Sequence, residues 1–78
     1  MKLSDVRDRF TDYYRANPTW GSLHVVLDDL NVADSNVQFC LQYAKENGDT
    51  EGEALAEILA QMSRSQRLRL ARIPLQRD

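Results

Sequence analysis

The sequence predicts an all-α fold, a compact single-domain bundle of four to five short helices over residues 1–78. Apolar residues recur at the helical spacing of i, i+3, i+4 and i+7, most clearly from Val37 to Ala44. The chain contains only three Gly and two Pro, which leaves little material for the turns of β-hairpins. Residues that favour helix caps precede the apolar segments, so the sequence also marks the breaks between helices.

Two helices are expected in the first half of the chain. The first covers Asp5–Asn17 with Ser4 as its N-cap, and it ends because Pro18 disfavours the α conformation in the residue before it. A shorter second helix is expected over Leu23–Leu30, after the turn at Gly21-Ser22. Adjacent valines give this segment some strand character. The absence of a second strand to pair with favours the helix.

The third expected helix covers Asn36–Asn47 and is capped by Asp34 or Ser35. Gly48 follows it and supplies the left-handed conformation with which many helices end. At the far end of the chain, a tail of about residues 75–78 is expected to fray.

Two capping-box patterns predict the starts of the last two helices. Thr50 with Glu53 predicts the start of the fourth. Ser63 with Gln66 predicts the start of a fifth over Arg64–Arg72, which the following Ile-Pro pair stops. The pattern alone leaves open whether the fourth and fifth helices are continuous.

The apolar stripes of these helices predict the hydrophobic core. Trp20 is expected to pack over the edge of this core, and Cys40, on the stripe of the third helix, to be a buried thiol without chemical function. The residues expected to form the core are Leu23, Val26, Leu27, Val37, Leu41, Leu55, Ile58 and Leu59.

The charges are distributed unevenly along the chain. Residues 1–63 hold five basic and eleven acidic side chains, whereas residues 64–78 hold five arginines and one aspartate. One interpretation is a solvated surface that complements the helix dipoles, and the other is a two-signed surface that docks a charged partner. Under the second interpretation the candidate partner-binding residues are Asp28, Asp29, Asp34, Glu51, Glu53, Glu57, Arg64 and Arg67.

A helix-turn-helix reading of the third and fourth helices is disfavoured. The short connection between them contains a Gly and is suitable. However, the helix that would enter the major groove carries three glutamates between residues 51 and 57, which phosphate would repel. Nucleic acid could instead be bound by the arginine-rich last helix, through Arg64, Arg67, Arg69 and Arg72.

His24, Asp28 and Asp29 form the one constellation that resembles a reactive site. His24 and Asp28 are four positions apart, so the two share a helix face and could bind a metal or form an oriented general base. A zinc site needs three or four ligands, and the chain has no second His and no Cys pair. We therefore expect no catalytic residue, no metal and no cofactor, and interpret the pair as a structural hydrogen bond.

The sequence also indicates where the protein works. It has no apolar run near the ~20 residues of a membrane span and no signal-peptide pattern. A lone cysteine fits a reducing compartment. The expectation is a cytoplasmic protein that does not contact membranes.

Four blocks of the sequence resemble small uncharacterised proteins encoded by tailed phages and prophages. The blocks are Trp20–Asp29, Val37–Cys40, Gly48-Asp49 and Met62–Arg67, and the likeness runs over residues 13–71. The resemblance implies expression in an infected bacterial cytoplasm. It also implies an accessory protein that binds a host or phage component, a class that includes inhibitors of host defence such as anti-CRISPR proteins. It assigns no function to individual residues.

Three functional hypotheses follow. The first is a non-enzymatic protein whose acidic surface binds, and thereby inhibits, a protein or ribonucleoprotein complex of host or phage. The second is a small nucleic-acid-binding regulator that uses the arginine-rich last helix. The third is a metal-dependent hydrolytic accessory protein centred on His24, Asp28 and Asp29. A second copy of the chain is a further candidate partner.

Overall fold

Four helices and no strand make up the part of the chain that the computed structural model describes, which is residues 2–16, 26 and 32–73. The helices are α1 (Leu3–Ala16), α3 (Asp34–Glu46), α4 (Thr50–Ala60) and α5 (Arg64–Arg72). The predicted all-α fold is thus confirmed for this part of the chain. The helix expected over Leu23–Leu30 lies outside the described residues, except for Val26, whose backbone is helical.

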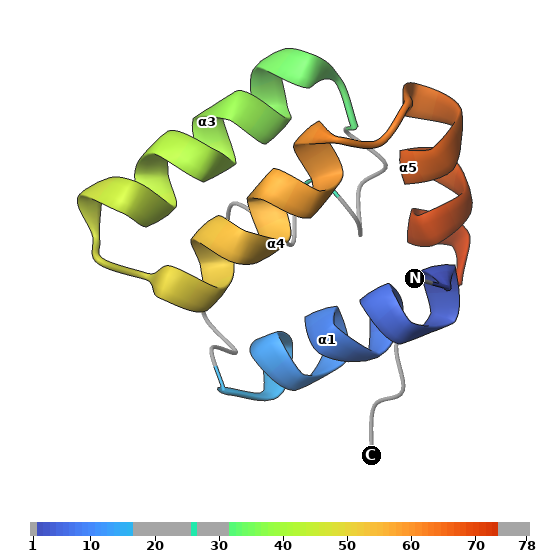
Figure 1. Ribbon diagram of the computed structural model, residues 1–78, viewed down its shortest axis with the longest axis horizontal. Helices are drawn as coiled ribbons and strands as arrows, with labels where there is room; N and C mark the ends of the chain where they lie inside the picture. Colours follow the sequence, from blue (N-terminus) through green and yellow to red (C-terminus); the bar gives the residue numbers. More distant parts are fainter. Residues whose placement is uncertain (1, 17–25, 27–31, 74–78) are drawn as a thin grey trace.

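Helix α4 is at the centre of the arrangement. Figure 1 shows α3 and α1 on either side of α4, with α5 across the end of this layer. Helix α1 packs against both α4 and α5, and α3 packs along α4. The radius of gyration of the Cα atoms is 11.2 Å, close to the value of about 11.5 Å expected for a compact domain of this length.

The core is filled by side chains from all four helices and from the segment before α3. Val26, Val37, Leu55 and Leu59 are fully buried, as the sequence predicts. Each such side chain contributes about 1.5–3 kcal/mol through its removal from water. The largest fully buried side chains are Phe10, Leu55, Leu59, Leu70, Val26, Val32 and Val37.

Two of the expected core residues are less buried than predicted. Leu41 and Ile58 are only partly buried and pack against the edge of the core. Helix α1 takes much of the central space instead, because Phe10 and Tyr13 fill it from the other side of α4. The expected positions of Leu23, Leu27 and Trp20 lie outside the described residues.

The first two described helices begin differently from the sequence prediction. Ser4 lies inside α1 and is not its cap, because the carbonyl of Lys2 already accepts the first helical hydrogen bonds. Helix α3 has Ala33 as its N-cap, without a side-chain hydrogen bond. Asp34 and Ser35 therefore lie in its first turn, where Asp34 faces the positive end of the helix dipole.

Helix α4 is capped one residue earlier than predicted. The side chain of Asp49 accepts a hydrogen bond of 3.0 Å from the backbone N–H of Gly52. The proposed capping box of Thr50 with Glu53 is therefore wrong, because aspartate is at least as good a cap as threonine and stands just before it. The left-handed conformation of Gly48 is confirmed, with φ of 67°.

The predicted capping box at the start of α5 is confirmed. The backbone N–H of Gln66 donates to Ser63 Oγ at 3.2 Å, and the backbone N–H of Ser63 donates to Gln66 Oε1 at 2.8 Å. Helices α4 and α5 are thus separate, joined by a turn over residues 61–63. Helix α5 ends before Ile73, as expected.

Candidate partner-binding surfaces

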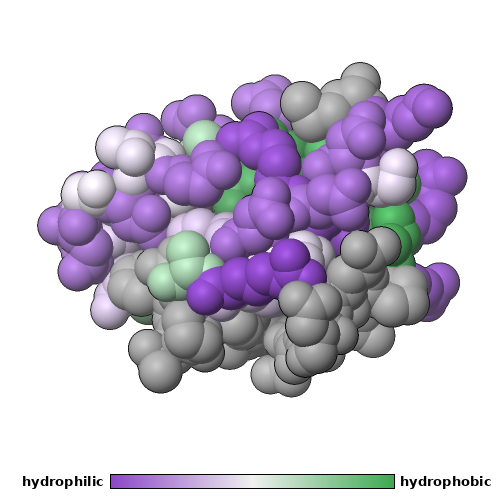
Figure 2. Space-filling model, turned by 90° about the horizontal axis from the view of Figure 1, so that it is seen from below, coloured by the Kyte–Doolittle hydropathy of each residue, from purple (hydrophilic) through white to green (hydrophobic). Residues whose placement is uncertain are grey.

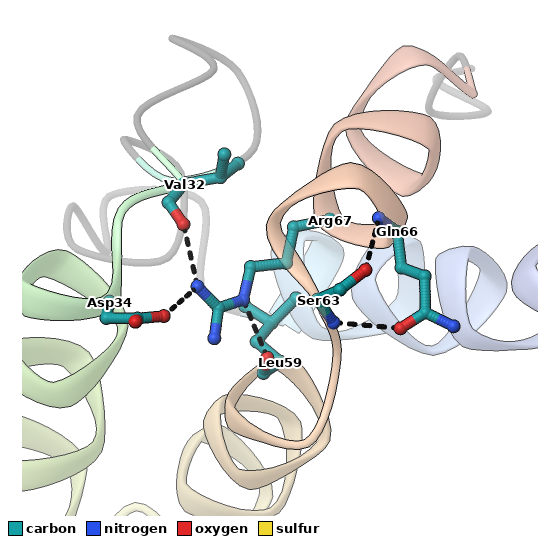
Figure 3. Close-up of polar contacts among 6 residues, drawn as sticks. All are labelled: Val32, Asp34, Leu59, Ser63, Gln66 and Arg67. Atoms are coloured by element: carbon teal, nitrogen blue, oxygen red, sulfur yellow. Dashed lines mark hydrogen bonds and ion pairs between the residues drawn. The ribbon is translucent and has the colours of Figure 1, made fainter.

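Arg67 was predicted to bind a partner at the surface, but it lies in the interior. Only 3% of its surface is exposed. Its Nε donates to the carbonyl of Leu59 at 2.8 Å, and its Nη1 donates to the carbonyl of Val32 at 2.9 Å (Figure 3). The expectation that Arg67 lies on the surface beside Arg64 is therefore wrong.

Arg67 is held in the interior because two backbone carbonyls, those of Leu59 and Val32, accept hydrogen bonds from it. Leu59 is in the last turn of α4, where its carbonyl accepts from the backbone N–H of Met62 at 3.1 Å and can take a second donor, and α4 has no basic residue in that turn. Arg67 supplies the missing positive charge from α5. Its Nη1 also pairs with the carboxylate of Asp34 at 2.6 Å, although the side chain of Asp34 is 88% exposed. Asp34 is thus already engaged with Arg67.

The acidic candidates differ in whether they have a partner within the chain. Glu51 forms an ion pair with Arg9 at 2.7 Å, and both side chains are well exposed. Glu53 and Glu57 of α4 form no ion pair within residues 2–16, 26 and 32–73. Asp28 and Asp29 lie outside the described residues. Among the described candidates, Glu53 and Glu57 therefore carry the charge that is left for a partner.

A shallow depression, here called the α4 groove, runs over the outward side of α4. Its volume is about 650 Å³. Its apolar walls come from α3 and α4 and are partly buried, so they are neither sealed in the core nor fully exposed. The groove is lined by Leu41, Ala54, Ile58 and Ala60 as apolar residues and by Arg9, Gln38, Glu57 and Gln61 as polar ones.

A second acidic surface lies on α1 and was not among the predicted binding residues. Asp5, Asp8 and Asp12 are all exposed, and none forms an ion pair within the described part of the chain. Figure 2 views the molecule from the side on which α1 lies, and the part of the surface that is coloured by hydropathy is largely hydrophilic. The spacing of i, i+3 and i+7, opposite the apolar stripe of α1, is the sequence signal that identifies this surface.

The outer face of α5 is positively charged. Arg64, Arg69 and Arg72 are exposed and make no hydrogen bond or ion pair with any residue that the structure describes. Helix α5 contains no acidic residue. Its arginines are therefore divided between the interior, which holds Arg67, and the solvent.

Tyr13, Asp49 and Gly52 form a polar cluster where α4 begins. The Tyr13 hydroxyl donates to Asp49 Oδ2 at 2.5 Å, the carboxylate that also caps α4. Burial of the phenol raises the pKa of Tyr13, and the hydrogen bond to Asp49 raises it further. The phenol therefore stays protonated near neutral pH and acts as a hydrogen-bond donor that joins α1 to α4. This cluster is structural.

Helix α3 carries two exposed aromatic side chains and a buried cysteine. Phe39 is 62% exposed and Tyr43 is 38% exposed, and their ring centroids are 6.0 Å apart. Cys40 is buried, as the sequence predicts. Its thiol is therefore shielded from solvent.

The predicted reactive constellation of His24, Asp28 and Asp29 lies outside the described residues, so its role stays a prediction. Within the described ranges, no group of three or more His, Cys, Asp or Glu side chains is placed to hold a metal ion. None of the described helices is long and apolar enough to cross a membrane.

Comparison of the chain with protein-family models, with curated proteins and with solved structures found no match.

Proposed function

We propose that the chain is a non-enzymatic interaction protein that binds a basic segment of a macromolecular partner in the α4 groove. The observation that carries this proposal is the combination found in the groove. Partly buried apolar side chains lie beside the carboxylate of Glu57, which has no ion-pair partner among the described residues. Such a combination favours an amphipathic, positively charged occupant.

The apolar part of the groove provides the driving force for docking. Leu41 and Ile58 are partly buried, so each still has apolar surface that a partner can remove from water. Burial of apolar surface contributes about 25 cal/mol per Å². Binding energy in interfaces concentrates in such central apolar contacts, with polar residues around them. Gln38 and Gln61 supply polar groups beside the apolar residues.

The charges of α4 determine the sign of the charge that a partner must carry. The helix carries three glutamates and no basic residue. Arg9 lines the groove but is paired with Glu51, which leaves Glu53 and Glu57 uncompensated among the described residues. The exposed aspartates of α1 extend the negative field, and fields of this kind steer an oppositely charged partner towards its site.

The resemblance to phage-encoded and prophage-encoded proteins supports a partner in the bacterial cytoplasm. In this proposal the partner is a protein or ribonucleoprotein complex of host or phage. If its basic segment normally contacts nucleic acid, an occupied α4 groove would compete with that nucleic acid and inhibit the complex.

The proposal is tested by affinity capture from a bacterial host lysate with three baits: wild type, Glu57→Lys and Glu46→Lys. Both variants reverse one exposed carboxylate, but only Glu57 lines the groove. We expect wild type and Glu46→Lys to retain the same stoichiometric basic partner at low salt, and Glu57→Lys to lose it.

Circular dichroism of all three baits establishes that each is folded. The absence of any stoichiometric partner would contradict the proposal. Equal capture by the two variants would also contradict it, because the groove would then not be the binding surface.

A further inference from the structure

Helix α5 departs from the charge pattern of the other three described helices. Each of α1, α3 and α4 has an acidic residue in its first turn, whereas α5 has none. Instead α5 starts with Arg64 at its first position, next to the positive end of its own dipole. A cation at that end is unfavourable unless an anion offsets it. Departures of this kind that the fold does not compensate are expected at functional positions.

The orientation of α5 is fixed by its inner side. Arg67 is bonded to the carbonyls of Leu59 and Val32, and Leu70 is fully buried. The helix therefore cannot roll without breaking these contacts. Because of this constraint, Arg64 and Arg69 are held on the solvent side of a rigid element. The backbone that carries these arginines therefore loses little entropy when the helix binds a ligand.

We propose that the outer face of α5, defined by Arg64, Arg69 and Arg72, binds the phosphate backbone of a nucleic acid. The rise from the first to the last of these arginines is about 12 Å, at about 1.5 Å per residue. One strand of a duplex carries a phosphate about every 3.4 Å along its axis, so the face spans about three to four phosphates. Each guanidinium presents a planar fork of donors that matches phosphate oxygens.

The composition of this face favours nucleic acid over an acidic protein. Protein interfaces are anchored by buried aromatic and aliphatic side chains. Among the described residues, the large hydrophobic side chains that are exposed are Phe39 and Tyr43, both on α3. The exposed neighbours of the arginines on α5 are instead Ser65 and Gln66, and Leu68, the large apolar residue nearest to them, is partly buried against the core. Such a face contacts phosphates and reads no base sequence.

This binding site is independent of the α4 groove. It uses other residues on another helix and attracts ligands of the opposite charge. Failure of one proposal therefore leaves the other standing.

The test is fluorescence anisotropy with a short labelled single-stranded DNA and with the corresponding duplex, titrated with the full chain. Between about 50 and 200 mM salt we expect the logarithm of the binding constant to fall linearly with the logarithm of salt concentration. Three phosphate contacts predict a slope of about −2 for the single strand and about −3 for the duplex. The triple variant Arg64→Ala, Arg69→Ala, Arg72→Ala should bind at least about tenfold more weakly at the lower salt concentration.

A matched triple variant controls for net charge. Lys2→Ala, Arg15→Ala, Lys45→Ala also removes three exposed positive charges, but from α3 and from the α1 region. We expect it to retain more of the affinity and the salt slope than the α5 variant does. Circular dichroism of both variants verifies that each is folded.

Three results would overturn the proposal. The first is the absence of binding at about 50 mM salt. The second is an equal loss of affinity in the two triple variants, which would show an effect of net charge alone. The third is displacement of the labelled DNA by polyglutamate as efficiently as by unlabelled DNA, which would assign the face to acidic polypeptides.

Discussion

Arg67 and Arg64 are three residues apart on α5, yet one is an interior group and the other a surface charge. Arg67 is 3% exposed and donates to two backbone carbonyls, while Arg64 is exposed and makes no hydrogen bond or ion pair with a described residue. The residue type is the same and the helix is the same. The difference arises from the other segments, because the end of α4 and the segment before α3 bring carbonyls to the inner side only. Whether arginines that are clustered in sequence form a charged surface therefore depends on the segments that pack against their helix.

The largest effect that separates the two faces is expected from Arg67→Ala. The substitution removes the donor of the Val32 carbonyl, and it leaves the Leu59 carbonyl with the backbone N–H of Met62 at 3.1 Å. A buried polar group left without a partner costs about 1–3 kcal/mol, so we expect the free energy of unfolding to fall by about that amount. Urea denaturation followed by circular dichroism measures it. A loss below about 0.5 kcal/mol, the size of an ordinary surface effect, would show that Arg67 is dispensable.

The opposite end of α4 offers a second large effect at Gly52. A Cβ atom there would lie 2.3 Å from Asp49 Oδ2 and 3.1 Å from the Tyr13 hydroxyl. We expect Gly52→Ala to destabilise the protein by about 1–3 kcal/mol, because the carboxylate has to move.

The Asp49→Ala background tests this cause. Without the carboxylate the clash with it is absent, and alanine is favoured over glycine within a helix by about 1 kcal/mol. Gly52→Ala should then be neutral or stabilising. An unchanged loss in that background would show that another contact is responsible.

Tyr13→Phe is expected to have an intermediate effect, which depends on pH. Loss of the hydrogen bond to Asp49 should cost about 1 kcal/mol near neutral pH. Since the pKa of Tyr13 is raised in the folded state, the folded chain holds this proton more tightly than the unfolded chain. The stability of wild type should therefore decrease as the pH rises above about 10, the ordinary pKa of tyrosine. Thermal melts across this range should show a shallower decrease for Tyr13→Phe, and parallel curves would contradict the assignment.

Asp34→Ala should have a small effect, although its carboxylate pairs with Arg67. The side chain of Asp34 is 88% exposed, and exposed ion pairs contribute about 0–1 kcal/mol. Comparison with Arg67→Ala by urea denaturation shows whether the carbonyls or the ion pair hold the arginine. A loss as large as that of Arg67→Ala would assign the main role to the ion pair.

The sequence predicts the helices well because their signal is local. The apolar stripe from Val37 to Ala44 and the capping box of Ser63 with Gln66 both depend on residues close in sequence. The N-caps of α3 and α4 differ from the predicted residues because adjacent residues compete for the same role. At α4, for example, Asp49 stands directly before Thr50.

The burial of Arg67 could not be predicted, because it depends on segments that are distant in sequence. Val32, one of its two carbonyl acceptors, is 35 residues away in sequence. The acidic face of α1, in contrast, could have been recognised from the spacing of Asp5, Asp8 and Asp12. The position of Glu57 beside an apolar groove becomes visible only once α3 and α4 are packed together.

The division of α5 into two faces is tested most directly by the free energy of unfolding of the Arg64→Ala, Arg69→Ala, Arg72→Ala triple variant, measured by urea denaturation. Surface substitutions usually change stability by no more than about 0.5 kcal/mol each. Removal of Arg64 also takes a cation away from the positive end of the helix. We therefore predict a stability within about 1 kcal/mol of wild type. A loss as large as that of Arg67→Ala would contradict the division, because the outer arginines would then also hold the fold together.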